Sequence, residues 1–228
     1  MTCNCQDCII RDVTIFSDLG EGELKSISLL IHLSRYRKHQ ILFLEDNPAH
    51  TVFIIKSGMI KVSKSLEDGR EQILRVLRSG DILGFEAIYE DSYSATAEAL
   101  SKAELCCLNK ERLLQLLETN SRISFKMMKA LGKELEEAQS KIRDLGLKNA
   151  REKMATFLLS QVSPSEKSGD KEKKLTLGLS RQEISDMVGL SQETVSRILS
   201  EFKKDKIIKT DRKEIVILKP DKLTSLSS

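Results

Sequence analysis

Residues 180–202 read SRQEISDMVGLSQETVSRILSEF, and this stretch decides the fold of the C-terminal part of the chain. The spacing of Ser180 and Glu183 predicts a capping box, because a hydroxyl and a carboxylate three residues apart can satisfy each other's free backbone amides. The short helix predicted after them ends at Gly189, and Ser191 can cap a second helix. Two short helices joined by a glycine-containing turn predict a helix-turn-helix.

The second predicted helix has an apolar inner face and a polar outer face. The inner face consists of Val195, Ile198, Leu199 and Phe202, which recur at helical spacing. In a helix-turn-helix the first outward side chains of the second helix enter the major groove of DNA. Here the outward residues are Gln192, Glu193, Ser196, Arg197 and Glu201.

Two strand-like runs, at 207–210 and 214–218, follow this helix and enclose a basic tip. Such a hairpin makes the module a winged helix-turn-helix. Residues 148–228 hold 17 Lys and Arg against 12 Asp and Glu, whereas residues 1–147 hold 20 against 22, so we expect a polyanion at the C-terminal part. The alternative is a helical hairpin packed for stability, with basic residues on a solvated face. The candidate phosphate contacts are Lys203, Lys204, Lys206, Arg212 and Lys213.

The N-terminal half contains short apolar or alternating runs that are typical of β-strands. Turn signals separate them at Ser57-Gly58, Glu67-Asp68-Gly69 and Ser79-Gly80-Asp81, where glycine supplies the positive φ that tight turns need. Many short strands at regular turn spacing predict a compact barrel or sandwich flanked by helices. The predicted strands cover residues 52–55, 59–62, 72–77 and 104–108.

A helical stripe with steps of four and three residues follows the strands. Its members are Ser124, Met128, Leu131, Leu135, Ala138, Ile142 and Leu145, with a charged face opposite. A narrow seam of this length favours pairing with a second copy of the chain over packing on the β domain. A further apolar helix is predicted over 148–162, and residues 163–174 are polar and predict a surface loop.

The overall composition excludes several classes of protein. An apolar fraction of 40% is enough for a packed core, and no run of about 18 apolar residues could cross a membrane. The N-terminus lacks a basic segment followed by an apolar stretch, so no secretion signal is expected. Five cysteines are too few for a disulfide scaffold, which favours a cytoplasmic, reducing location.

From Cys5 to about Leu218 the chain resembles the CRP/FNR family of bacterial transcription regulators. The turns Ser57-Gly58 and Ser79-Gly80-Asp81 and the segment 84–88 are similar to the family's β-roll effector domain. The stripe at 124–145 is similar to its dimerisation helix, and 189–197 to its recognition helix. The resemblance implies an α+β fold with a jelly-roll-like β-roll sensor domain, a long dimerisation helix and a C-terminal winged helix-turn-helix. The implied parts are 1–20 (a cysteine-bearing segment), 21–120 (the β-roll), 121–147 (the dimerisation helix) and 148–228 (the DNA-binding domain).

Glu193, Ser196 and Arg197 resemble the pattern of the FNR branch of the family. Arginine can donate two hydrogen bonds to guanine, glutamate can accept one from cytosine, and serine can reach either kind of base edge. The resemblance implies a homodimer that reads TTGAT-like palindromic half-sites on double-stranded DNA, with RNA polymerase as a further partner and no enzymatic activity. Both activation and repression fit the sequence. A ligand-binding protein whose C-terminal module docks another protein is the alternative of a different class.

The predicted effector domain departs from the cyclic-AMP branch of the family, which uses a Gly-Glu pair and a nearby Arg-Ser. In this chain Gly84 precedes Phe85, and the later position reads Tyr93-Ser94 without an arginine. Burying a phosphate without a cationic partner is costly, so cyclic AMP is not an expected ligand.

The cysteines suggest an iron–sulfur cluster as a possible cofactor. Cys5 and Cys8 resemble the start of the oxygen-sensing FNR motif, and Cys106 falls near the family's distant fourth cysteine. The remaining family cysteine falls at Thr14, so the candidate ligands are Cys3, Cys5, Cys8 and Cys106. Alternatives are a zinc site, a redox disulfide, or thiols without a function. The aspartate that makes FNR dimerisation conditional falls at Ala138, which would let the seam close without a cluster.

Overall fold

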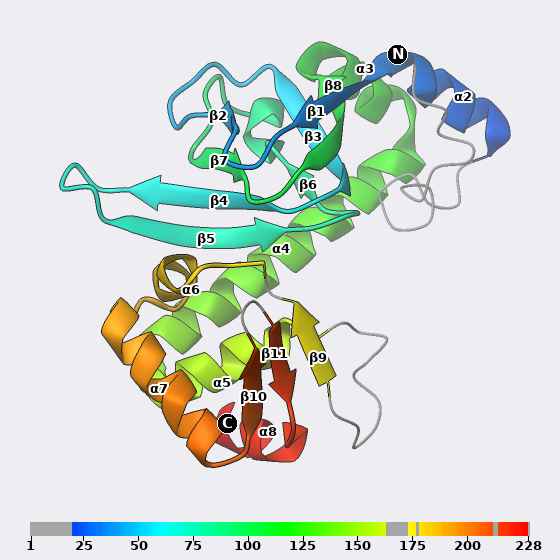
Figure 1. Ribbon diagram of the computed structural model, residues 1–228. Helices are drawn as coiled ribbons and strands as arrows, with labels where there is room; N and C mark the ends of the chain where they lie inside the picture. Colours follow the sequence, from blue (N-terminus) through cyan, green and yellow to red (C-terminus); the bar gives the residue numbers. More distant parts are fainter. Residues whose placement is uncertain (1–19, 163–172, 177, 212–213, 228) are drawn as a thin grey trace. The chain divides into compact units, whose positions relative to one another are not determined.

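A long helix, α4 (Ser121–Leu147), runs through the boundary between two structural units of the chain (Figure 1). The computed structural model describes residues 20–162, 173–176, 178–211 and 214–227. The boundary lies between Leu135 and Glu136, and each unit has its own hydrophobic core. The mixed helix and strand fold expected from the sequence is confirmed.

Among the described residues, the N-terminal unit contains two antiparallel four-stranded sheets. Their strand orders are β1-β8-β3-β6 and β2-β7-β4-β5. The strands are β1 (Ile31–Tyr36), β2 (Ile41–Phe43), β3 (Thr51–Ser57), β4 (Ile60–Ser65), β5 (Glu71–Leu77), β6 (Ile82–Leu83), β7 (Thr96–Ala99) and β8 (Ala103–Asn109). The helices of this unit, besides the start of α4, are α2 (Glu21–Leu30), η2 (Phe85–Ile88) and α3 (Lys110–Thr119). The four predicted strands correspond to β3, β4, β5 and β8.

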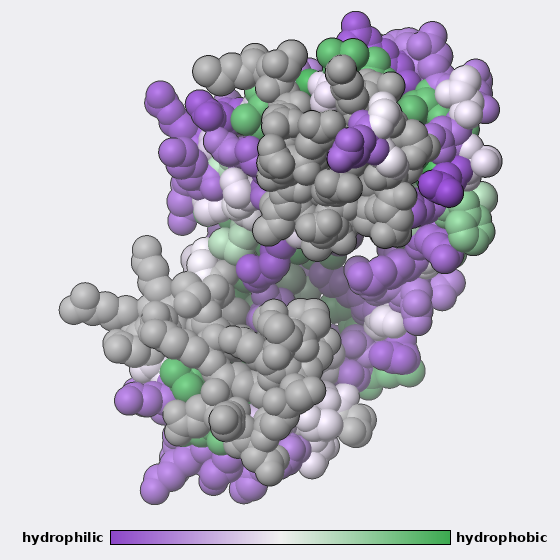
Figure 2. Space-filling model, turned by 90° about the vertical axis from the view of Figure 1, so that its right-hand side faces the viewer, coloured by the Kyte–Doolittle hydropathy of each residue, from purple (hydrophilic) through white to green (hydrophobic). Residues whose placement is uncertain are grey.

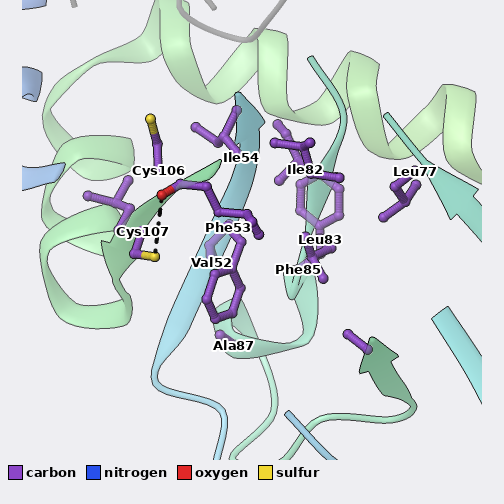
Figure 3. Close-up of a cluster of buried hydrophobic side chains, with 14 of the residues drawn as sticks. Val52, Phe53, Ile54, Leu77, Ile82, Leu83, Phe85, Ala87, Cys106 and Cys107 are labelled. Carbon is purple, nitrogen blue, oxygen red and sulfur yellow. Dashed lines mark hydrogen bonds between the residues drawn. The ribbon is translucent and has the colours of Figure 1, made fainter. Parts of the chain in front are cut away.

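The core of this unit lies on both faces of β3 and β8. The residues from Val52 to Ile55 are all buried, because this strand is central in its sheet and helical residues of α3 and α4 join the same cluster. The ring of Phe43 stacks on Tyr93 at 3.7 Å and on Phe53 at 5.7 Å between centroids. Figure 3 shows part of this cluster.

Glycine turns fix the strand connections as the sequence predicts. Gly58, Gly69 and Gly80 have φ angles of 93°, 85° and 95°, a region that other residues rarely adopt. At Gly58 the chain also approaches β8 closely: a Cβ atom there would lie 2.6 Å from the carbonyl oxygen of Lys102. At Gly69 a Cβ atom would meet nothing within 4 Å.

Over its described residues, the C-terminal unit contains a three-stranded sheet and helices packed against a second core. Its sheet has the order β10-β11-β9, with antiparallel pairing throughout. Its elements after α4 are α5 (Ala150–Ser160), β9 (Lys173–Thr176), α6 (Arg181–Val188), α7 (Gln192–Lys204), β10 (Ile208–Asp211), β11 (Glu214–Ile217) and α8 (Pro220–Ser227). The predicted winged helix-turn-helix is therefore present.

One sequence prediction for this unit was wrong at its edge. The stretch 163–174 was expected to be loop, but Lys173 and Lys174 begin β9, which pairs with β11. Residues 163–172 lie outside the described part of the chain. Pairing with β11, about 40 residues further along the chain, makes this short polar segment a strand, and its local composition gives no such signal.

One face of the molecule is mainly polar where it can be described. In the view of Figure 2 the coloured surface is mainly hydrophilic, with smaller hydrophobic areas between. Within the described ranges, every helix is too short or too polar to cross a bilayer.

Replacing Gly58 by alanine is expected to destabilise the N-terminal unit more than the same change at Gly69. Both substitutions force a Cβ into a left-handed backbone, which costs about 1–2 kcal/mol. Only Gly58→Ala adds a clash with the backbone next to β8, worth roughly a further 1–3 kcal/mol. Denaturant unfolding followed by circular dichroism measures the free energy of unfolding of both variants. Equal losses in the two variants would show that the close approach is unimportant.

Candidate DNA-binding site

The turn between α6 and α7 is built by local hydrogen bonds. The Ser180 Oγ accepts from the Glu183 backbone N–H at 3.1 Å, and the Glu183 carboxylate accepts from the Ser180 N–H, so the predicted capping box is present. Gly189 ends α6 with φ 65°, and its N–H donates to the Ser185 carbonyl at 2.9 Å. A left-handed residue is needed here, which explains the glycine.

Helix α7 is capped at its start and buried along one side. The Ser191 Oγ accepts from the Thr194 N–H at 3.2 Å, as the sequence predicts. The inner face, Val195, Ile198, Leu199 and Phe202, is at most 2% exposed. Burial of this face fixes the rotation of the helix about its own axis. The outer side chains are therefore exposed at the N-terminal end of α7: Gln192, Glu193, Ser196 and Arg197.

Arg197 takes part in a chain of ion pairs. Its Nη1 lies 2.7 Å from Oε1 of Glu201, one helical turn later, and its side chain is 64% exposed. The other oxygen of Glu201, Oε2, lies 3.2 Å from Nη1 of Arg151 in α5. Arg151 also places Nη2 2.8 Å from Oδ2 of Asp205. The spacing of Arg197 and Glu201 could have signalled their pair, but nothing local in the sequence points to Arg151.

The predicted phosphate contacts are only partly within the described chain. Lys203, Lys204 and Lys206 are exposed at or just after the C-terminal end of α7. A rise of 1.5 Å per residue puts Lys203 about 15 Å along the axis from Glu193. Arg212 and Lys213 lie outside the described residues, although the strands β10 and β11 on either side of them are paired.

The predicted dimer stripe on α4 is distinct from the part of α4 that enters the N-terminal core. Ile123 and Met127 are buried in that core, with Ala130 packed against it. The stripe itself is exposed at Met128, Leu131, Leu135, Ala138 and Ile142, whereas Leu145 is half-buried. Adjacent residues point about 100° apart on a helix, so Met127 and Met128 serve different faces.

The candidate metal ligands are mostly outside the described chain. Cys3, Cys5 and Cys8 lie there, whereas Cys106 is 2% exposed in β8, where it pairs with Leu33 and Ile54 of the neighbouring strands. Figure 3 shows Cys106 and Cys107 on opposite sides of β8. Burial raises the pKa of the Cys107 thiol, which donates to the Leu105 carbonyl at 3.8 Å. Over the ranges that the structure covers, no three His, Cys, Asp or Glu side chains cluster as a metal site.

Near Gly84, the polar side chains of the N-terminal unit form hydrogen bonds within this unit. The Ser94 hydroxyl donates to the Glu86 carboxylate at 2.7 Å, and the Tyr93 hydroxyl donates to the Thr51 carbonyl at 2.7 Å. Burial raises the pKa of Tyr93 to about 12, so this phenol stays neutral. A carboxylate hydrogen-bonded to Ser94 would repel a phosphate. That cyclic AMP is not the ligand stays a prediction from the sequence.

Two segments of the chain match known protein families. Residues 33–120 match the cyclic nucleotide-binding domain, and residues 152–226 match the Crp-like helix-turn-helix domain. Over 225 residues the chain is 32% identical to the fumarate and nitrate reduction regulatory protein of Vibrio cholerae, with 98% of this chain and 90% of that protein covered. It is 28% identical to the transcriptional activator protein anr of Pseudomonas aeruginosa, with 98% and 92% covered. The solved structure of FixK2 from Bradyrhizobium japonicum matches with a TM-score of 0.79 and 29% identity, covering 87% of this chain and 98% of that one.

Proposed function

Because the chain belongs to the CRP/FNR family of DNA-binding transcription regulators, we propose that it reads a palindromic DNA site as a homodimer. Its relatives are transcription regulators, and the chain is not an enzyme. The observation that carries the proposal is the exposed N-terminal end of α7 opposite a completely buried face. That arrangement holds four polar side chains where a helix in the major groove meets base edges.

The side chains at this end of α7 suit one G·C pair in each half-site. Arg197 can donate two hydrogen bonds to O6 and N7 of guanine, and Glu193 can accept from the amino group of cytosine. Ser196 can reach either kind of base edge, and Gln192 extends the contact area. A TTGAT-like half-site, implied by the resemblance of Glu193, Ser196 and Arg197 to the FNR branch, contains such a pair.

The lysines at the far end of α7 suit a different role. Lys203 and Lys204 are exposed about three turns from the reading end, so they would contact phosphates outside the bases read by Arg197. In a palindrome the second half-site lies about one helical turn of DNA away, which requires a second recognition helix. The exposed stripe of α4 would supply the contact between the two copies.

Arg197→Ala is expected to weaken discrimination for the guanine by about 1–3 kcal/mol, roughly 5- to 150-fold. Fluorescence anisotropy measures the dissociation constants for a TTGAT palindrome and for a version whose G·C pair is replaced. The ratio of the two constants is the discrimination. Lys203→Ala is the control, because loss of a phosphate contact weakens binding to both duplexes alike. It also lowers the salt slope, which is the slope of log binding constant against log salt concentration, by about 1. A wild-type ratio in Arg197→Ala would contradict base reading by this residue.

Leu135→Asp is expected to convert the dimer to a monomer, because two carboxylates would be buried in the seam. Leu66→Asp at the β4–β5 hairpin is a matched control, since Leu66 is 58% exposed and Leu135 is 59% exposed. Sedimentation equilibrium of both variants measures the mass. A Leu135→Asp protein that remains dimeric would show that the α4 stripe is not the interface.

We also propose that the cysteines respond to redox state through an iron–sulfur cluster held by Cys3, Cys5, Cys8 and Cys106. Such a cluster needs four thiolates and supplies electron transfer when bound. Cys106 suits a ligand role, because ligation would stabilise a thiolate that is otherwise costly to bury. The twelve residues 9–20 can extend about 40 Å, and they lead through α2 into β1, which is paired with β8 beside Cys106. A regulator of the same fold that uses thiol redox chemistry, another effector or no signal is the alternative.

Cys106→Ala is expected to abolish iron and sulfide binding, whereas Cys107→Ala should retain both. The two thiols are equally buried neighbours, but Cys107 faces the other side of β8, where burial keeps its thiol protonated. Anaerobic purification with iron and sulfide analysis and visible absorbance measures the content. Wild-type protein without iron and sulfide would remove the cluster and favour the alternative.

A further inference from the structure

We infer that Arg151 and Glu201 are positioning residues that hold Arg197 in the orientation for reading guanine. This inference rests on the proposed base contact of Arg197. It concerns two side chains that the recognition helix alone does not explain, one of them in α5 and 46 residues earlier than Arg197. The structural basis is the continuous ion-pair chain Arg197–Glu201–Arg151–Asp205.

The chain of ion pairs is attached to the core of the C-terminal unit. The guanidinium carbon of Arg151 lies 5.2 Å from the centroid of the Phe202 ring, and Phe202 is completely buried. Arg151 follows Asn149, which caps α5 with a capping box, so its backbone is fixed as well. One guanidinium thus rests on a buried ring while it holds the carboxylates of Glu201 and Asp205.

Glu201 links this anchored arginine to Arg197 through its two carboxylate oxygens. One oxygen, Oε2, accepts from Arg151, and the other, Oε1, accepts from Arg197. An isolated ion pair between residues four apart on an exposed helix is only weakly stabilising, so Arg197 paired with Glu201 alone would sample many rotamers. The contact with Arg151 already fixes the side chain of Glu201. Less conformational entropy is therefore lost when Arg197 pairs with Glu201.

The pairing leaves Arg197 able to read a base. A guanidinium has five N–H donors, and the contact to Glu201 uses Nη1. Donors on Nε and Nη2 stay available for the two acceptors on the guanine edge. Glu201 therefore restricts the direction of the arginine without competing for all of its donors.

Two other roles for Arg151 predict different results. If Arg151 contacted a DNA phosphate itself, its loss would weaken binding to all sequences equally and lower the salt slope by about 1. If Arg151 only joined α5 to α7, its loss would lower thermal stability and leave the discrimination of the folded protein unchanged.

For Glu201, simple charge repulsion predicts that removal of the carboxylate tightens binding to every duplex and leaves the ratio between the two duplexes unchanged.

The experiment measures discrimination between the TTGAT palindrome and its G·C-replaced version in full-length variants. We expect Arg151→Ala, Arg151→Lys and Glu201→Ala each to lower the ratio about three- to tenfold. Arg151→Lys keeps the charge, but a single ammonium cannot reproduce the two-sided contact with Glu201 and Asp205. Lys153→Ala is the matched control, because it removes one positive charge from another side of α5 and should leave the ratio unchanged.

A double-mutant cycle separates positioning from independent effects. In an Arg197→Ala background, Arg151→Ala should no longer change the ratio, because the side chain that it positions is gone. Unchanged ratios in the Arg151 and Glu201 variants, or an equal loss on both duplexes, would overturn the inference while the role of Arg197 stands. If Arg197→Ala itself keeps the wild-type ratio, the proposed base contact fails, and the inference fails with it. Arg151→Lys keeps the test valid if Arg151→Ala does not fold.

Discussion

The rotation of α7 about its own axis is the constraint on which the DNA-binding arrangement depends. Four apolar side chains bury one side of this helix completely, and Ser191 fixes where the helix begins. A shift of one residue would turn every side chain by about 100° and remove Arg197 from the exposed end. The hydrophobic core of the C-terminal unit therefore determines which polar residues are presented, before any contact with DNA is made.

The features that could be predicted from the sequence are those encoded by neighbouring residues. The capping box at Ser180, the left-handed turn at Gly189 and the hairpin turn at Gly69 each need a particular residue type within a few positions. Their physical causes are local hydrogen bonds and backbone sterics, so a short window contains all the information. The same holds for the outward direction of Arg197, which follows from helical periodicity.

The features that could not be predicted depend on partners far away along the chain. Strand β9 forms because β11 pairs with it, although two of its four residues are lysine. Lys61 lies in an alternating run and is nevertheless only 9% exposed, because Glu71 and Glu98 on the adjacent strands accept from its ammonium group. Arg151 belongs to the same class, since its partners are about 50 residues later. Of the candidate site, the outer residues of α7 and the face that buries this helix followed from the sequence, and the contacts of Arg151 with Glu201 and Asp205 did not.

Pairing of Arg197 with Glu201 also bears on the balance between affinity and specificity. Nonspecific attraction to DNA scales with the number of phosphates that are neutralised, so an unpaired arginine on the reading face would strengthen binding to every sequence. A neighbouring carboxylate reduces that attraction on every duplex, and in the inferred arrangement it also restricts the direction of the arginine. In the proposed base contact, the two directed hydrogen bonds to guanine would form only at the correct base and would not be offset in the same way. A recognition arginine restrained by a carboxylate therefore gives up general affinity and keeps discrimination. For a regulator that must find few sites among many competing ones, the ratio between specific and nonspecific binding matters more than either affinity alone.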